Sequence, residues 1–298
     1  MNMISTAEAA KRWGISERSV RNYCACGRIP GAFLTGKTWN IPEDAQKPRR
    51  ANAPGEHTQT LTDILKSEKQ LQLHGGIYHR LQIELTYNSN HIEGSRLSHD
   101  QTRYIFETNT IGLTDPAVRV DDIVETANHF RCIDMVIENT SGPLTEAFIK
   151  KLHAVLKNGT SDSRLSWFAV GEYKKLPNEV GGIQTAAPEE IEAQMRALLK
   201  AYNAIRQPGF DDLLEFHYRF ERIHPFQDGN GRIGRLLLLR ECLKNGIVPF
   251  IIDDDMKMYY YRGLKEWRSE PGYLRDTCLA AQDRFKAYLD YFRIPYES

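Results

Sequence analysis

The stretch that decides the fold is Ile223–Arg235, IHPFQDGNGRIGR, in the last third of the chain. It places a histidine, a carboxylate, a glycine-rich turn and two arginines close together. Pro225 disfavours helical geometry at the preceding His224, so a helix is predicted to end there. The apolar run Leu236–Leu239 predicts a second helix that begins near Arg232. A glycine turn between two helices, with no strand, is expected here.

The turn has the features of a phosphate-binding site. Gly229 and Gly231 let backbone amides converge without obstruction from side chains. The free amides and the dipole at the start of the following helix also favour an anion. Arg232 and Arg235 are three residues apart and share a helix face. Two guanidiniums match a ligand with two or more phosphates better than a ligand with a single carboxylate. We therefore expect an enzyme that acts on a phosphate compound, and a purely structural helix-loop-helix is the alternative.

Two further side chains of the stretch carry chemistry. Asp228 offers a hard oxygen ligand, and one carboxylate plus substrate phosphates is the usual way in which proteins hold Mg²⁺. The imidazole of His224 has an ordinary pKa of about 6.5, so it can act as a neutral base at pH 7. General-base help of this kind contributes about 10²- to 10⁴-fold to a rate.

Composition and charge place this stretch in an ordinary globular protein with two parts. The 298 residues are 41% hydrophobic and 26% charged, and no apolar run approaches the roughly 18 residues that span a bilayer. The start of the chain lacks a signal peptide pattern, and the five scattered cysteines fit reduced thiols in the cytoplasm. Residues 1–50 hold nine basic and four acidic residues, a net charge of +5, against −5 for the remainder. A basic head on an acidic body indicates two domains with different partners.

The head is expected to be a small helical domain with a hairpin. Ser5 and Glu8 have capping-box spacing, which predicts a first helix over 7–13 that ends at Gly14. A second helix is expected from Ser16 to about residue 26. The stretch 33–42 predicts a two-stranded ribbon that turns at Gly36.

This outline resembles the winged helix-turn-helix of excisionase and MerR-type DNA-binding heads over residues 3–46. The resemblance implies that Arg18, Arg21 and Asn22 approach the major groove, and that Lys37 lies on the wing beside phosphates. A module that binds protein, with these charges simply solvated, is the alternative. A domain this small usually needs a dimer for useful affinity, so a homodimer is an open expectation.

The rest of the chain is expected to be mainly helical. Domain bounds are set at 1–46 for the head, 47–60 for a polar linker and 61–298 for the body. Glycines in 168–186 break the helical run, and that stretch is the one part of the body expected to be sheet-like. Helical spacing runs from Leu61 to Tyr87. Further helices are predicted near 100–108, 119–138, 145–157, 188–206, 211–222, 232–244, 256–268 and 272–292.

The body resembles the Fic family over roughly 61–290, because His224-x-Phe226-x-Asp228-Gly229-Asn230-Gly231-Arg232-x-x-Arg235 fulfils the Fic signature. The resemblance implies an all-helical core with a small β-hairpin flap, and transfer of AMP from ATP to a Ser, Thr or Tyr hydroxyl of a target protein. It implies that His224 deprotonates the hydroxyl and that Asp228 binds Mg²⁺. It assigns ATP phosphates to Gly229, Asn230, Gly231 and Arg232, with Arg235 at the γ-phosphate.

Two more segments are similar to parts of Fic proteins. Val180, Gly181, Gly182 and Ile183, within 168–186, resemble the flap that holds the target backbone by strand addition. Tyr260 and Tyr261 resemble the segment that lines the adenine pocket, and packing in a helical core is the alternative for both.

A third segment, Ser89-Asn90-His91-Ile92-Glu93-Gly94, matches the Fic inhibitory pattern. Ser89 and Glu93 are four residues apart and share a face of a helix expected over about 80–94, which Gly94 ends. The resemblance implies that Glu93 pairs with Arg235 and takes the place of the γ-phosphate. Low basal activity is therefore expected.

Several alternatives stay open at the level of the sequence. The chain could be a DNA-binding transcriptional regulator whose Fic body senses a nucleotide or a partner. The same site could use another phosphate donor, such as UTP or a phosphocholine carrier. In some Fic enzymes the inhibitory glutamate also helps to remove AMP, which is a further expectation for Glu93.

Overall fold

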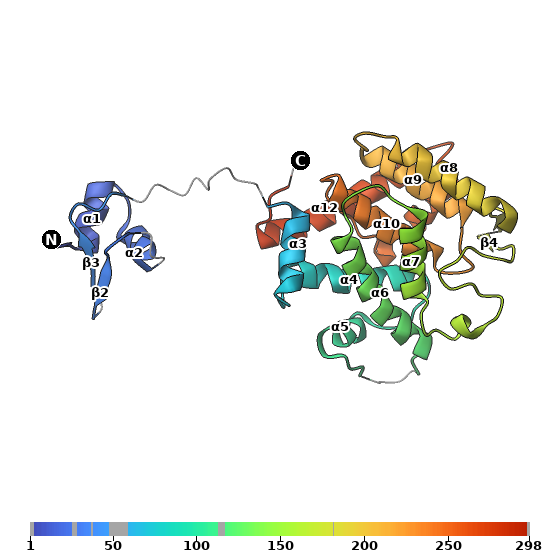
Figure 1. The fold of residues 1–298 in the computed structure, drawn as a ribbon, viewed down its shortest axis with the longest axis horizontal. Coiled ribbons are helices and arrows are strands. Elements are labelled where there is room, and N and C mark those ends of the chain that lie inside the picture. Colours follow the sequence, from blue (N-terminus) through green and yellow to red (C-terminus); the bar gives the residue numbers. More distant parts are fainter. Residues whose placement is uncertain are drawn as a thin grey trace. The chain divides into compact units, whose positions relative to one another are not determined.

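The computed structural model describes residues 3–25, 29–36, 38–47, 59–112, 117–180 and 182–296. They fall into two compact units, Met1–Thr58 and Gln59–Ser298. Figure 1 shows the first unit in blue as helices with a small sheet, and the second as a bundle of helices. The mainly helical fold expected from the sequence is confirmed. Most of the predicted linker, residues 48–58, lies outside the described residues.

The first unit begins with two short helices. Helix α1, Thr6–Trp13, is capped by Ser5, whose hydroxyl accepts from the Glu8 amide while the Glu8 carboxylate accepts from the Ser5 amide. It ends at Gly14, which has the left-handed backbone (φ 63°) that a glycine adopts without strain. Helix α2, Glu17–Ala25, follows.

A three-stranded antiparallel sheet completes this unit. Strands β2, Phe33–Thr35, and β3, Thr38–Pro42, form the expected ribbon, and β3 also pairs with β1, Met3–Ile4. Strand β1 was not predicted, because two residues are too few to show an alternating pattern. A small core of buried side chains joins helices and sheet: Ala9, Ala10, Trp13, Val20, Cys24, Ile29 and Ile41.

The four residues expected at DNA are only partly described. Arg21 is exposed and pairs with Glu17 at 3.0 Å. Lys37 and the side chains of Arg18 and Asn22 lie outside the described residues. The contact with DNA therefore stays a prediction.

The second unit consists of helices joined by loops. Its α-helices are α3 Leu61–Gln70, α4 Ile77–Ile92, α5 His99–Thr108, α6 Val120–Glu138, α7 Glu146–Leu156, α8 Ile191–Asn203, α9 Phe210–Ile223, α10 Asn230–Lys244, α11 Lys257–Glu266 and α12 Gly272–Phe292. Short 3₁₀ turns are η1 Asp162–Arg164, η2 Pro188–Glu190 and η3 Asp254–Met256. Among the described residues, no helix has the length and apolar character needed to cross a membrane.

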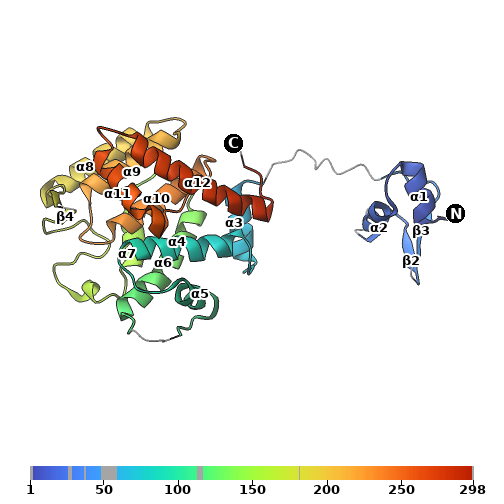
Figure 2. The same cartoon turned by 180° about the vertical axis from the view of Figure 1, so that it is seen from behind.

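Helix α10 is the centre of this unit. It packs against α9, α6, α4 and α7, and the two opposite views in Figures 1 and 2 both show it among the other helices. Its residues Leu236–Leu239 are all buried, as are both of its arginines near the N-terminus. A helix that is buried on all sides has apolar residues all round and not only along one face. In the sequence it therefore appears as a continuous apolar run.

The stretch 168–186 differs from the expected sheet. It is mostly irregular and contains only two short antiparallel strands, β4 Glu179–Val180 and β5 Ile183–Gln184. Gly182 has a positive φ of 75° at the turn between them, and Gly181 lies outside the described residues. Glycines mark the turn, but they break regular structure in the rest of the stretch.

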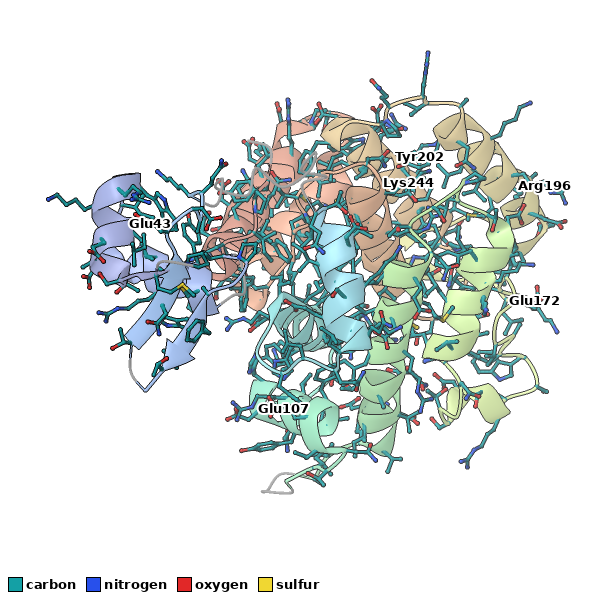
Figure 3. The ribbon with its side chains drawn as sticks, turned by 60° about the vertical axis from the view of Figure 1, so that its left-hand side comes forward. Glu43, Glu107, Glu172, Arg196, Tyr202 and Lys244 are labelled. Atoms are coloured by element: carbon teal, nitrogen blue, oxygen red, sulfur yellow. The ribbon has the colours of Figure 1, made fainter. Side chains whose placement is uncertain are left out.

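Polar contacts also stabilise the unit away from α10's N-terminus. The carboxylate of Glu241 on α10 is fully buried and accepts from the phenol of Tyr202 at 2.9 Å, with Lys244 at 3.8 Å. Figure 3 shows Tyr202 and Lys244 close together, while Glu172 and Arg196 lie on the outer surface. A buried carboxylate with partners on both sides is consistent with a stable helix interior.

Candidate active site

The site begins where α9 ends. His224 is the C-cap of α9 and has a left-handed backbone (φ 51°, ψ 62°), while its amide donates to the carbonyl of Phe220 at 2.9 Å. A non-glycine residue pays of order 1–2 kcal/mol for this conformation, so surrounding contacts must hold it. Pro225 disfavours helical geometry at the residue before it, His224, which explains why α9 ends at Ile223.

Two contacts fix the loop between α9 and α10. The ring of Phe226 is fully buried and stacks on His153 of α7, with ring centroids 4.0 Å apart and planes 4° from parallel. The side chain of Asn230 accepts from the Phe226 amide and donates to the Phe226 carbonyl, both at 2.8 Å. The loop is therefore closed onto the first turn of α10.

This use of Asn230 narrows one expectation. The residue was assigned to ATP phosphates, and its side chain is 1% exposed with both of its polar atoms bound to Phe226. Only the backbone amide of Asn230 remains for an anion. The side chain instead shapes the loop from which Gly229, with φ 82°, begins α10.

Removing this closure should destabilise the protein. We expect Asn230→Ala to lower the free energy of unfolding by about 1–3 kcal/mol, because it leaves the buried amide of Phe226 without a partner. Urea denaturation measures the change. Asn245→Ala, at the other end of α10, is the matched control, since Asn245 makes one bond to the Glu241 carbonyl. Equal losses in the two variants would contradict the role of Asn230.

Glu93 and Arg235 form the contact expected between distant segments. Glu93 is the C-cap of α4, just before Gly94 with φ 95°. Its Oε1 accepts from Nη2 of Arg235 at 2.6 Å. Ser89 adds two bonds at 2.9 Å, because its hydroxyl accepts from Arg235 Nε and its carbonyl from Nη2. Arg235 is 5% exposed, and its Nε and Nη2 atoms both donate to residues at this end of α4.

The Glu93 carboxylate also lies at the N-terminus of α10. A Cβ at Gly231 would come within 2.3 Å of Glu93 Oε1, so the carboxylate lies directly against this glycine. The N-terminus of a helix is where its free amides and dipole favour negative charge. Glu93 thus occupies the position where the sequence predicts a phosphate. The absence of a side chain at Gly231 is what permits this approach.

Asp228 belongs to a group of four charged side chains, the charge ring, whose other members are Lys157, Arg232 and Glu125. Asp228 Oδ2 contacts Lys157 Nζ at 2.7 Å and Arg232 Nη2 at 3.1 Å, and Glu125 binds both Lys157 and Arg232 from the other side. Burial alone would raise the pKa of the Asp228 carboxyl, but Arg232 and Lys157 hold it well below its usual range. Asp228 is therefore ionised at any pH at which the protein is used.

Lys157 and Glu125 were not predicted as site residues. Lys157 follows the buried Leu156 at the end of α7, and Glu125 lies in the second turn of α6. In the sequence they look like ordinary helix charges. The only hint of a buried charge in the sequence was that Lys157 directly follows the apolar face of a helix.

The residues around Asp228 fit a metal shared with a nucleotide. The Asp228 side chain is 48% exposed, and both cations touch the same oxygen, Oδ2. Within the part of the chain that the structure describes, no group of three or more His, Cys, Asp or Glu side chains could hold a metal alone. A cation here would need phosphate oxygens as further ligands, as Mg²⁺ does in many nucleotide sites.

His224 is prepared to be a neutral base. Burial, with help from the positive charge of Lys174, lowers the pKa of its imidazole to about 4. Its Nδ1 is buried and has no hydrogen-bond partner among the described residues. At neutral pH the ring is therefore uncharged and free to accept a proton.

The stretch that contains the two short strands is attached to the catalytic loop. The amide of Lys174 donates to the Pro225 carbonyl at 2.9 Å, and Asn178 Nδ2 donates to the Phe226 carbonyl at 3.2 Å. The buried ammonium of Lys174 donates to Asn178 and Thr185, both at 2.6 Å. These three polar residues were missed by the sequence analysis. They place the strand β4 next to the loop that holds His224, and leave Val180 exposed.

The two tyrosines expected at an adenine base differ from each other. Tyr260 is 1% exposed, packs in the core, and its hydroxyl lies 2.6 Å from Nε2 of the buried His217. Its assignment to a nucleotide pocket was wrong, because the helical pattern did not show which face is inside. Tyr261 is 39% exposed, and its contact with adenine stays a prediction.

A buried helical core carries a histidine, a glycine turn at a helix N-terminus and a glutamate paired with an arginine. Residues 143–242 of this unit, a third of the chain, match the Fic/DOC family. The match confirms a Fic domain in these residues, and the wider bounds of 61–298 stay a prediction.

Known proteins support the same relationship. The protein adenylyltransferase Fic of Nematostella vectensis is 27% identical over 184 residues, which cover 60% of this chain and 42% of that relative. A Fic domain containing signaling protein of Bacteroides thetaiotaomicron has a similar structure, with 28% identity, a TM-score of 0.58, and coverage of 77% of this chain and 90% of that one. A Fic family protein of Desulfovibrio desulfuricans shares the fold at 22% identity and a TM-score of 0.59, over 77% of this chain and 72% of that one. The chain spans less than half the length of the curated relatives that it matches.

Proposed function

We propose that the Fic domain is a protein adenylyltransferase, which transfers AMP from ATP to a Ser, Thr or Tyr hydroxyl of a target protein. One observation carries this proposal: the loop from His224 to Arg235 arranges a neutral imidazole, an ionised carboxylate and two arginines around the N-terminus of one buried helix. The name of the Nematostella relative supports the same reaction.

In this proposal each group has one task. His224 accepts the proton of the target hydroxyl, whose oxygen attacks the α-phosphorus of ATP while pyrophosphate leaves. The amides of residues 229–232 hold phosphates at the start of α10, and Arg235 binds the γ-phosphate once it is free of Glu93. Mg²⁺, held by Asp228 and the nucleotide, would neutralise charge on the phosphates. Exposed Val180 at the strand β4 would receive the target backbone.

The second part of the proposal is autoinhibition. Glu93 takes the anion position at Gly231 and neutralises Arg235, so ATP would have to displace a carboxylate to bind in a reactive pose. The same carboxylate, close to the site, would be available to position water for removal of AMP. Incubation of an AMP-modified target with the wild-type protein tests this activity. Release of AMP would support it, and an unchanged target would contradict it.

Mass spectrometry of Glu93→Gly protein tests the reaction itself. The variant is incubated with Mg²⁺ and either ATP or UTP, with and without a cell extract as a source of targets. We expect an AMP adduct with ATP, on the chain itself or on a target, and a far smaller yield in the variant that also carries His224→Ala. A UMP adduct of equal yield, or no adduct with either nucleotide, would contradict the proposal.

The low pKa of His224 gives a pH prediction. We expect kcat/KM of Glu93→Gly protein to stay level from pH 7 to about 5 and to fall only near pH 4, because the imidazole loses its role as a base when it is protonated below its pKa of about 4. An unperturbed histidine would cause a fall near pH 6.5. Rates of labelled AMP transfer across this range decide between the two. A fall centred near pH 6.5 would show that the imidazole is not desolvated as described.

For the first unit we propose DNA binding. It is supported by the helix–Gly14–helix order and the antiparallel ribbon beside it. We expect the full chain to retard DNA in a gel in a manner that weakens steeply with salt, because phosphate contacts release counterions. Arg21→Glu should weaken binding, while Arg131→Glu on α6 serves as a control of equal charge change. Retardation that does not depend on salt concentration would contradict this proposal. So would an equal loss of retardation in the Arg21→Glu and Arg131→Glu variants.

A further inference from the structure

The charge ring has a closed and alternating order. Going round it, Arg232 binds Glu125, Glu125 binds Lys157 at 2.5 Å, Lys157 binds Asp228 at 2.7 Å, and Asp228 binds Arg232 at 3.1 Å. Its members come from α6, the end of α7, the catalytic loop and α10. Two cations and two anions make its formal charge zero. Each side chain in the ring has a neighbour of opposite charge on both sides.

Three of the four side chains in the ring are largely buried. The side chains of Lys157, Arg232 and Glu125 are 2%, 4% and 14% exposed, whereas that of Asp228 is 48% exposed. The ring therefore meets the site only through the carboxylate of Asp228. Asp162 lies 3.5 Å from Lys157 but is 43% exposed, so water screens its charge far more than it screens the ring.

Lys157 is held in place from both ends. Its backbone caps α7, with the amide donating to the His153 carbonyl at 3.0 Å. Its ammonium lies 5.3 Å from the ring centre of Phe168, besides its contacts with carboxylates. An ammonium fixed in this way acts as a permanent positive charge beside Asp228, at the distance of a direct hydrogen bond.

This arrangement determines how Asp228 meets a divalent cation. A lone exposed carboxylate attracts such an ion, but here Lys157 and Arg232 already compensate the charge of Asp228, and they repel a third cation. A nucleotide changes the balance, because its phosphates bring several negative charges and further oxygen ligands. The ring then has an anion on its open side, and the phosphate charges offset the repulsion of the metal by Lys157 and Arg232.

We propose that Lys157 makes metal binding dependent on nucleotide: it prevents a divalent cation from binding at Asp228 alone, and admits it only together with a polyphosphate. Lys157 is thus a positioning residue that sets the order in which metal and nucleotide bind. This inference rests on the proposed function, since a metal at Asp228 is part of that proposal.

Titration of the nucleotide-free full chain with Mn²⁺, followed by electron paramagnetic resonance of free Mn²⁺, tests the inference. We expect weak or undetectable binding to the wild type. Lys157→Met leaves one unit of negative charge in the ring and should tighten Mn²⁺ binding about tenfold or more. Lys151→Met, an exposed lysine on the same helix α7, is the matched control and should behave as the wild type.

Two further variants locate the gained site. Lys157→Met combined with Asp228→Asn should lose the gain, because the carboxylate that receives the metal is then neutral. Lys157→Met combined with Glu125→Gln restores a neutral ring and should bind Mn²⁺ more weakly than Lys157→Met alone. Melting in the presence of EDTA shows that each variant is folded, and Lys157→Gln, which keeps a hydrogen-bond donor for the carboxylates, replaces Lys157→Met if the latter is unfolded.

Two results would overturn the inference. The first is equal Mn²⁺ affinity of the wild type and the folded Lys157 variant without nucleotide. The second is a gain in affinity that survives Asp228→Asn. These measurements need no transferase activity, so a chain that gains a Mn²⁺ site but never transfers AMP would sink the proposed function and leave the role of Lys157 intact.

Discussion

Replacing Glu93 by glycine is expected to raise AMP transfer about 10- to 100-fold, the range of a coupling free energy of about 1–3 kcal/mol between two ligands of one site. The wild-type chain holds Arg235 through three bonds from α4, one from Glu93 and two from Ser89. Loss of the carboxylate frees the anion position at Gly231 and returns one donor of Arg235 to the γ-phosphate. Incorporation of labelled AMP into total protein measures the change.

The size of the effect should follow the number of contacts that are removed. Ser89→Ala takes one bond from Arg235 but leaves the Glu93 carboxylate at the start of α10, so its increase should be much smaller. Glu107→Gly is the control for loss of a carboxylate near a helix end, because Glu107 pairs with His79 on α4, outside the contacts of Arg235. Equal AMP incorporation by the wild type and Glu93→Gly would show that the contact does not inhibit.

The pairing of Glu93 with Arg235 was expected from the resemblance to Fic proteins, whose two motifs each lie in a short stretch of sequence. Local signals add only the helix ends: Glu93 precedes a glycine that ends a helix, and Arg235 follows a glycine turn. Such signals depend on backbone conformation over a few residues, which is where sequence patterns are most informative. The helices of the second unit were predictable for the same reason, with ends that moved by only a few residues.

The charge ring could not be predicted in this way. Asp228 and Arg232 lie in the glycine-rich stretch, but Glu125 and Lys157 come from two other elements, and each of these two resembles a solvated charge. Their burial follows from tertiary packing around α10, which no local period records. Tyr260 failed for a related reason: a run of three tyrosines in a helix shows that one face is buried, but not which tyrosine lies on it.

Asn230 shows how a correct motif can still mislead. Its position in the glycine turn favoured a phosphate, yet its amide closes the loop onto Phe226. A side chain that satisfies two buried backbone groups is needed for the shape of the loop, and shape and ligand contact give the same sequence signal. The backbone amides of Gly229 and Gly231 carry no such ambiguity, because they have no side chain to use elsewhere.

The second large effect is expected for His224. In the Glu93→Gly background, His224→Ala should lower the rate of AMP transfer by about 10²- to 10⁴-fold, the usual contribution of a general base. ATP affinity should stay unchanged, because the imidazole has no phosphate to bind in the proposed arrangement and the amides at the start of α10 remain. Single-turnover transfer and isothermal titration with ATP measure the two quantities separately.

A structural effect of the substitution must be separated from loss of the base. His224 has a left-handed backbone, which asparagine also tolerates, so His224→Asn keeps the favourable conformation but has no comparable base. If both variants lose transfer and both still bind ATP, the loss belongs to the imidazole and not to the loop. His74→Ala, an exposed histidine, should change neither quantity. Retained transfer in His224→Asn would remove the general base from the mechanism, and loss of ATP binding in both variants would mean that His224 holds the loop instead.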